Sequence, residues 1–102
     1  MASTHRAPVY SRNGVVAASQ PLAVSAGIEI LQRGGSAVDA AIAVSAVLAV
    51  VEPGASHLGG DAFVINYDSR KKSVTAFNGS GEAPHTATPS AYVDGKIGRA
   101  HV

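Results

Sequence analysis

Gly34-Gly35-Ser36-Ala37-Val38-Asp39-Ala40-Ala41 opens a stretch that stays apolar, apart from one serine, as far as Val51 and stops at Glu52-Pro53. Ser36 followed three residues later by Asp39 predicts a capping box, in which each side chain accepts from the other residue's backbone N–H. Pro53 disfavours helical geometry at Glu52. We therefore predict a helix that begins at Ser36 and runs to Val51, with a structural rather than a catalytic role for Asp39.

The predicted helix is apolar on every side, which is unusual for a surface helix. Its length of about fifteen residues is too short to cross a bilayer, for which about twenty are needed. A buried core helix is the better interpretation. Its alanines leave room for the close approach of a sheet or a second helix: Ala40, Ala41, Ala43, Ala46 and Ala49.

The composition is that of a folded chain of at most one domain. The chain has 102 residues, 46% of them hydrophobic and 15% charged, and its mean hydropathy is +0.17, which argues against disorder. The apolar residues are mostly alanine and valine, with three Tyr, two Phe and no Trp. Such small side chains bury little area each, so the core of a freestanding chain would be thin. An all-apolar helix needs more cover than such a core supplies, which indicates that the chain is part of something larger.

Charge and cysteine content exclude several classes of function. The net charge is +1, and the cationic residues are scattered except for Arg70-Lys71-Lys72. We predict that this triplet lies in a solvated turn. No nucleic-acid or membrane partner is indicated. The absence of cysteine excludes disulfides and thiol nucleophiles. No apolar segment typical of a signal peptide precedes Pro8, so a cytoplasmic location is favoured over export.

The remaining periodicity predicts an α+β arrangement. Residues 14–19 form a short apolar run typical of a buried strand, and residues 21–33 form an amphipathic helix that Gly34-Gly35 terminates. Residues 62–67 and 73–77 predict a β-hairpin around a turn at 68–72. The order strand, helix, helix, strand, strand places two helices on one face of an antiparallel sheet, whose other face needs a cover.

Local motifs alone assign no catalytic residue, cofactor or metal site. Of the four histidines, only His57 has a neighbour at ligand spacing, Asp61, and that pair lies in a glycine loop rather than on a helix face. Gly59-Gly60 lacks the lysine and hydroxyl residue of a phosphate-binding loop. Ser80 lies in a Gly-Ser-Gly turn without the pattern of a nucleophile elbow.

The order of several blocks indicates more than any single motif. Together they resemble the start of the large subunit of γ-glutamyltransferases, also called glutathione hydrolases, over residues 9–96: Gly14–Ala23, Ala26-Gly27, Ile30-Leu31, Gly34–Ala41, Val51-Glu52-Pro53, Leu58-Gly59-Gly60 and Ala83-Pro84. The resemblance implies an N-terminal-nucleophile hydrolase with a four-layer αββα sandwich. Residues 1–96 would be an N-terminal fragment of that sandwich, contributing a strand, two helices and a β-hairpin.

The resemblance also implies a mechanism whose nucleophile lies elsewhere. Enzymes of this kind are made as one precursor that cuts itself before a threonine, and the new N-terminal threonine attacks the γ-glutamyl amide with its own α-amine as base. No threonine of this chain occupies that position, so the fragment alone is expected to be inactive. Its expected partners are the substrate, the rest of the large subunit and the small subunit of the same precursor, with no cofactor.

One family function is expected within these residues. The large subunit carries an arginine just before Ala-Pro that binds the α-carboxylate of the γ-glutamyl group by a bidentate pair. Aligned on Ala83-Pro84, this arginine falls at Ser80 in the R-E-x-A-P form and at Glu82 in the G-S-G-R-A-P form, which this loop resembles more. Ser80 and Glu82 are therefore the predicted substrate-binding positions, by alignment only.

Neither position holds arginine, and this leaves alternatives open. Glu82 would repel a carboxylate, so a related amide hydrolase or acylase with a different donor is one alternative. A Glu82 side chain that only faces solvent is another. A stand-alone structural or binding module is a third, and a monomeric chain with a cooperative melt would support it. Residues 97–102 do not continue the family pattern and are expected to be a non-native tail.

Overall fold

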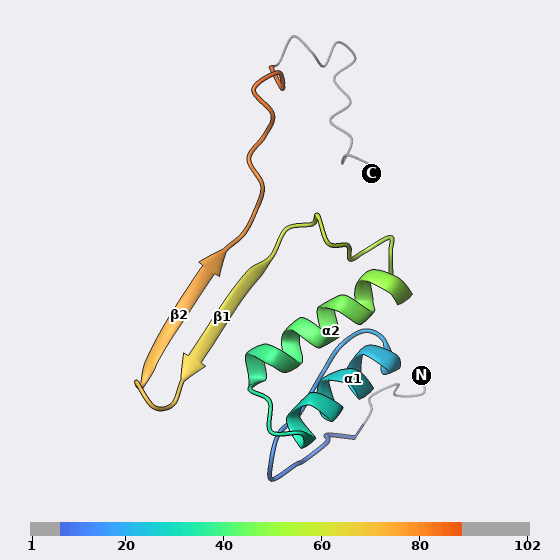
Figure 1. The fold of residues 1–102 in the computed structure, drawn as a ribbon, viewed down its shortest axis with the longest axis vertical. Helices are drawn as coiled ribbons and strands as arrows, with labels where there is room; N and C mark the ends of the chain where they lie inside the picture. The colour runs from blue at the N-terminus through green and yellow to red at the C-terminus, as the bar shows by residue number, and fades with distance from the viewer. Residues whose placement is uncertain (1–6, 89–102) are drawn as a thin grey trace, which may run out of the picture.

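The computed structural model describes residues 7–88, which form two helices followed by a two-stranded antiparallel sheet (Figure 1). The elements in chain order are α1 (Pro21–Gln32), α2 (Ala37–Val51), β1 (Phe63–Asp68) and β2 (Ser73–Asn78). Both predicted helices and the predicted hairpin are confirmed. Among these residues, no helix is long and apolar enough to cross a membrane.

Both ends of α1 are determined by local sequence. Pro21 occupies the first helical position, and the Gln20 side chain accepts a hydrogen bond from the Leu22 N–H at 2.6 Å. At the other end the Gly35 N–H donates to the Ile30 carbonyl at 2.9 Å, and Gly34 has a φ of +86°. This is a Schellman motif, which needs the left-handed conformation that glycine adopts without a Cβ penalty.

The predicted capping box starts α2. The Asp39 N–H donates to Ser36 Oγ at 3.2 Å, and the Ser36 N–H donates to Asp39 Oδ2 at 2.8 Å. The Ser36 hydroxyl also donates to Asp39 Oδ2, at 2.7 Å. The hydrogen bonds that the Asp39 carboxylate accepts both come from Ser36 at the start of the helix. This confirms the structural role of Asp39.

The capping box makes stability depend on pH. The Ser36 hydroxyl and then the Ser36 N–H hold the pKa of Asp39 below its usual value of 3.8. Because the folded-state pKa is lowered, the stabilisation is present above the unfolded-state pKa and is lost as pH falls through the folded-state value. Asp39→Ala should therefore lower the unfolding free energy of the full-length gene product at pH 7, with the difference from wild type closing as the pH falls below the usual Asp value of 3.8 and through the lowered folded-state pKa. Urea titrations at several pH values measure this; a difference that does not change with pH would refute the assignment.

The two helices pack closely because small residues face each other across the interface. Ala23 is fully buried, Gly27 is buried one turn later, and Ala40 of α2 is 4% exposed. A Cβ built on Gly27 would lie 2.7 Å from Val44 Cγ2. The Ser19 hydroxyl donates to Glu52 Oε2 at 2.6 Å, joining the start of α1 to the end of α2. The prediction that α2 leaves room for a second helix is confirmed.

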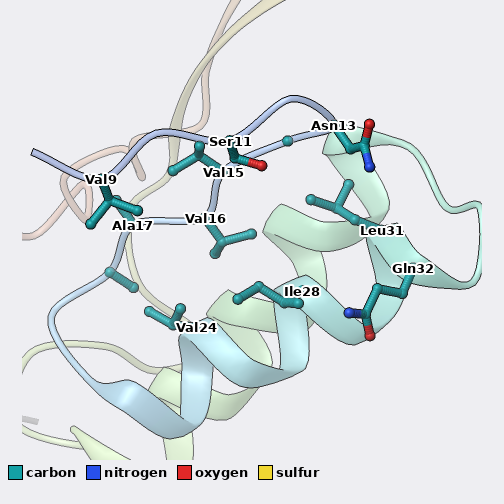
Figure 2. Close-up of a pocket in the computed structure, with 12 residues that line it drawn as sticks. Val9, Ser11, Asn13, Val15, Val16, Ala17, Val24, Ile28, Leu31 and Gln32 are labelled. Carbon is teal, nitrogen blue, oxygen red and sulfur yellow. The ribbon is translucent and has the colours of Figure 1, made fainter.

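The predicted strand at 14–19 is wrong. Residues 14–18 are not paired in a sheet, because among residues 7–88 β1 and β2 pair only with each other and a strand requires a ladder partner. The segment lies over α1 instead (Figure 2). Val16 Cγ1 would be 2.9 Å from a Cβ on Gly27, and Leu31 Cδ1 would be 3.4 Å from one on Gly14. Its apolar residues serve packing against a helix.

The hairpin has one apolar face and one mixed face. Its register pairs Phe63 with Asn78 and Asp68 with Ser73, and the connecting loop is 69–72, one residue shorter than predicted. Directly paired residues share a face, so the apolar face carries Phe63, Ile65, Tyr67, Val74 and Ala76, with Asn78 at its end as the one polar residue. Ile65 remains 82% exposed. In the described part of the chain the helices pack on each other rather than closely on the sheet, so the predicted layering of helices over one sheet face is not formed.

Candidate functional site

The loop that follows β2 contains both predicted site positions and is held against the start of β1. The Gly79 N–H donates to the Ala62 carbonyl at 2.7 Å, which continues the hairpin pairing one step beyond β2. Two residues later the Gly81 N–H donates to Asp61 Oδ1 at 3.1 Å. We call residues 78–82 the site loop. The structure therefore brings the site loop beside the glycine-rich segment 59–62.

The site loop contains a tight turn of its own at Asn78. Asn78 Oδ1 accepts from the Ser80 N–H at 3.0 Å and from the Ser80 hydroxyl at 2.8 Å. Such Asx turns fix a short loop without help from distant residues. A Cβ at Gly79 would lie 2.8 Å from the Phe77 ring and 3.0 Å from the Ala62 carbonyl oxygen. Gly79 is therefore needed for the close approach of the two backbones.

The two predicted site residues differ in how their side chains are engaged. The Ser80 hydroxyl is bound to Asn78 within the turn. Glu82 is exposed, and its carboxylate makes no hydrogen bond or ion pair with any of residues 7–88. Of the two positions, Glu82 is the one whose side chain is available to a ligand in the described residues. The cations of the hairpin, Arg70-Lys71-Lys72, lie at its opposite end.

The His57 to Asp61 segment forms a turn rather than a ligand cluster. The Gly60 N–H donates to the His57 carbonyl at 3.1 Å, and a Cβ on Gly60 would lie 3.3 Å from the same oxygen. The Asp61 carboxylate accepts from Gly81. Within residues 7–88 no three His, Cys, Asp or Glu side chains gather in a way that could hold a metal ion. The hydrogen bond between Asp61 and Gly81 was not predicted, since twenty residues separate them.

A groove of about 920 Å³ lies elsewhere, between residues 9–18 and α1 (Figure 2). Val16, Val24, Ile28 and Leu31 are among the side chains that line it, and no ionisable side chain does. The groove therefore offers apolar packing space rather than groups for acid–base or nucleophilic chemistry.

Comparison with known proteins places these features in a family. The family model described as Gamma-glutamyltranspeptidase matches residues 23–101. A glutathione hydrolase proenzyme of Bacillus subtilis (strain 168) is 40% identical over 83 residues, covering 81% of this chain and 14% of the relative. The glutathione hydrolase-like YwrD proenzyme of the same organism is 45% identical over 84 residues, covering 82% of this chain and 16% of the relative.

Solved structures agree with the sequence comparison. The γ-glutamyltranspeptidase from Pseudomonas nitroreducens complexed with L-DON matches with a TM-score of 0.73 and 35% identity, covering 81% of this chain and 24% of that one. The Bacillus anthracis transpeptidase CapD matches with a TM-score of 0.68 and 41% identity, covering 74% of this chain and 26% of that one. The chain thus spans 14–16% of these curated relatives, and the site loop lies within the residues that the family model matches.

Proposed function

This chain belongs to the gamma-glutamyltranspeptidase family, and on that premise we propose that it is the N-terminal part of the large subunit of an amide-cleaving N-terminal-nucleophile hydrolase. The activity belongs to the longer protein, since the chain spans only 14–16% of its curated relatives. The names of those relatives, proenzymes and glutathione hydrolases, support a precursor that is processed into two subunits and acts on γ-glutamyl amides.

The proposed reaction proceeds through an acyl-enzyme formed outside this chain. The hydroxyl of the N-terminal threonine of the small subunit attacks the amide carbonyl carbon, and the threonine α-amine takes up the hydroxyl proton. The C–N bond breaks as that proton passes to the leaving amine. Water or an acceptor amine then cleaves the ester. The contribution proposed for residues 7–88 is to position the acyl donor rather than to break its bond.

The observation that carries the proposed donor-positioning role is the placement of the site loop. Its base is paired to Ala62, its far end is bound to Asp61, and Glu82 beside that end is exposed and unpaired among the described residues. Glu82 is one of the two positions, with Ser80, at which the family resemblance expects an arginine. The proposal is that the side chain at this position meets the donor, and the two bonds that hold the loop support it.

Glu82 favours a second class of donor. A glutamate carboxylate beside the α-carboxylate of a γ-glutamyl group places two like charges together, which opposes binding. A 4-aminobutyryl donor lacks only that carboxylate and keeps the amine, so Glu82 would attract it. As a second candidate beside γ-glutamyl amide cleavage, we therefore propose an enzyme that accepts acyl donors without an α-carboxylate in preference to γ-glutamyl donors.

Processing of the full-length gene product tests the proposed function. The purified protein should consist of two polypeptides whose masses add up to that of the precursor, because self-cleavage is what creates the N-terminal nucleophile. Denaturing electrophoresis and intact-mass spectrometry measure this directly. A single uncut polypeptide that cleaves amides would exclude the proposed mechanism.

A further inference from the structure

We propose that Asp61 is a positioning residue for the donor, acting through the site loop; this proposal rests on the proposed function. Asp61 Oδ1 accepts a hydrogen bond from the Gly81 N–H at 3.1 Å, and Gly81 directly precedes Glu82. The Asp61 carboxylate thereby determines where the backbone next to the donor-facing side chain lies.

The other bonds of the site loop cannot do this. Those between Asn78 and Ser80 join residues two apart and shape the turn without fixing it to the rest of the molecule. The bond from Gly79 to Ala62 holds only the base of the loop. The far end depends on Asp61.

Packing does not hold the far end either. A Cβ built on Gly81 would meet no atom within 4 Å, so nothing packs on the side of this residue where a side chain would stand. A glycine in open space has a large conformational freedom to lose. Without the bond to Asp61, Gly81 and the adjoining Glu82 would sample many positions, and a displacement of about 1 Å at a donor-binding group is enough to weaken catalysis.

The role requires a hydrogen-bond acceptor at residue 61 and not a charge. Asparagine keeps a carbonyl oxygen in place of the carboxylate oxygen, whereas alanine removes the acceptor. Asp68 provides a matched control, because its Oδ1 likewise accepts backbone bonds, from the Arg70 and Lys71 N–H groups at 2.9 and 3.2 Å, at the opposite end of the hairpin.

The experiment compares Asp61→Ala, Asp61→Asn and Asp68→Ala in the full-length gene product. The donors are γ-glutamyl p-nitroanilide and 4-aminobutyryl p-nitroanilide, with release of p-nitroaniline as the signal. For the donor that the wild type cleaves better, Asp61→Ala should raise KM roughly tenfold, the factor for one lost hydrogen bond to a charged group, with kcat changed less. Asp61→Asn and Asp68→Ala should stay close to wild type in KM.

Amide hydrogen exchange gives a readout that does not need activity. Peptides spanning residues 78–82 should exchange faster in Asp61→Ala than in wild type and at the wild-type rate in Asp61→Asn. Wild-type KM and exchange in Asp61→Ala would overturn the proposal, as would an equal rise of KM in Asp68→Ala. If the wild type cleaved neither donor, the proposed function and the donor role would both fail, and the exchange rates alone would decide whether Asp61 holds the loop.

Discussion

Replacing Glu82 by arginine should raise kcat/KM of the full-length protein for γ-glutamyl p-nitroanilide by about ten- to a hundredfold. A bidentate pair between a guanidinium and the donor α-carboxylate contributes about 1.5–3 kcal/mol, and each 1.4 kcal/mol is a factor of ten. The substitution also removes the like charge that Glu82 places there. Turnover of 4-aminobutyryl p-nitroanilide, which lacks the α-carboxylate, should fall, because the substitution replaces the carboxylate that attracts its amine with a cation.

Two further variants separate the causes of this effect. Glu82→Gln removes the repulsion without adding a cation, so it should give a smaller gain than Glu82→Arg. Ser80→Arg places the arginine at the other position to which the alignment points. Because Ser80→Arg removes the hydroxyl that donates to Asn78 Oδ1 within the turn, it disturbs the site loop, and we expect no gain from it. If the ratio of kcat/KM for the two donors were the same in Glu82→Arg as in wild type, Glu82 would not be part of the donor-binding site.

Gly27→Ala should destabilise the protein by about 1–3 kcal/mol, although alanine is the better helix former. At an exposed helical position the same change would stabilise by about 1 kcal/mol. Gly27 is instead buried between two valines, and its Cβ would lie 2.7 Å from Val44 Cγ2 and 2.9 Å from Val16 Cγ1. Valine side chains have little rotamer freedom, so α1 must move away from α2 or from residues 14–18.

A double-mutant cycle makes this prediction specific. Val44→Ala removes the methyl group that the new Cβ would meet most closely, so it should be less destabilising in a Gly27→Ala background than in wild type. Ser25→Ala, at an exposed position of the same helix, is the control for helix propensity. Urea unfolding measures the free energy of unfolding of the four proteins of the cycle and of the Ser25→Ala control. Stabilisation by Gly27→Ala would show that the helices do not approach as closely as described.

The elements that the sequence predicted correctly are those with a local cause. The capping box at Ser36 and Asp39, the glycine pair that ends α1 and the two strand-like runs that flank the hairpin turn each act within a few positions, so local sequence identifies them. The predicted strand at 14–19 was wrong for the opposite reason. Its apolar run gave no indication of whether its partner would be a strand or a helix.

The buried stripe of α1 shows a second limit of sequence patterns. Periodicity directs attention to large apolar residues such as Leu22, yet Leu22 is 61% exposed while Ala23 is fully buried. Close helix packing selects the smallest side chains, which hydrophobic patterns count least. The candidate site also contains features that the sequence indicates and features that it does not. The positions of Ser80 and Glu82 followed from resemblance, whereas the bond between Asp61 and Gly81 depends on the tertiary path of the chain.

The proposed N-terminal-nucleophile mechanism is tested most directly by measuring the mass and N-terminal sequence of the subunits of the purified full-length gene product. We expect two polypeptides, the larger containing residues 7–88 and the smaller beginning with threonine, since that residue must be freed to act as nucleophile. Changing this threonine to alanine should leave the precursor uncut and inactive. A wild-type protein that stays in one piece while cleaving either anilide, or an alanine variant that is still cut and active, would contradict the account.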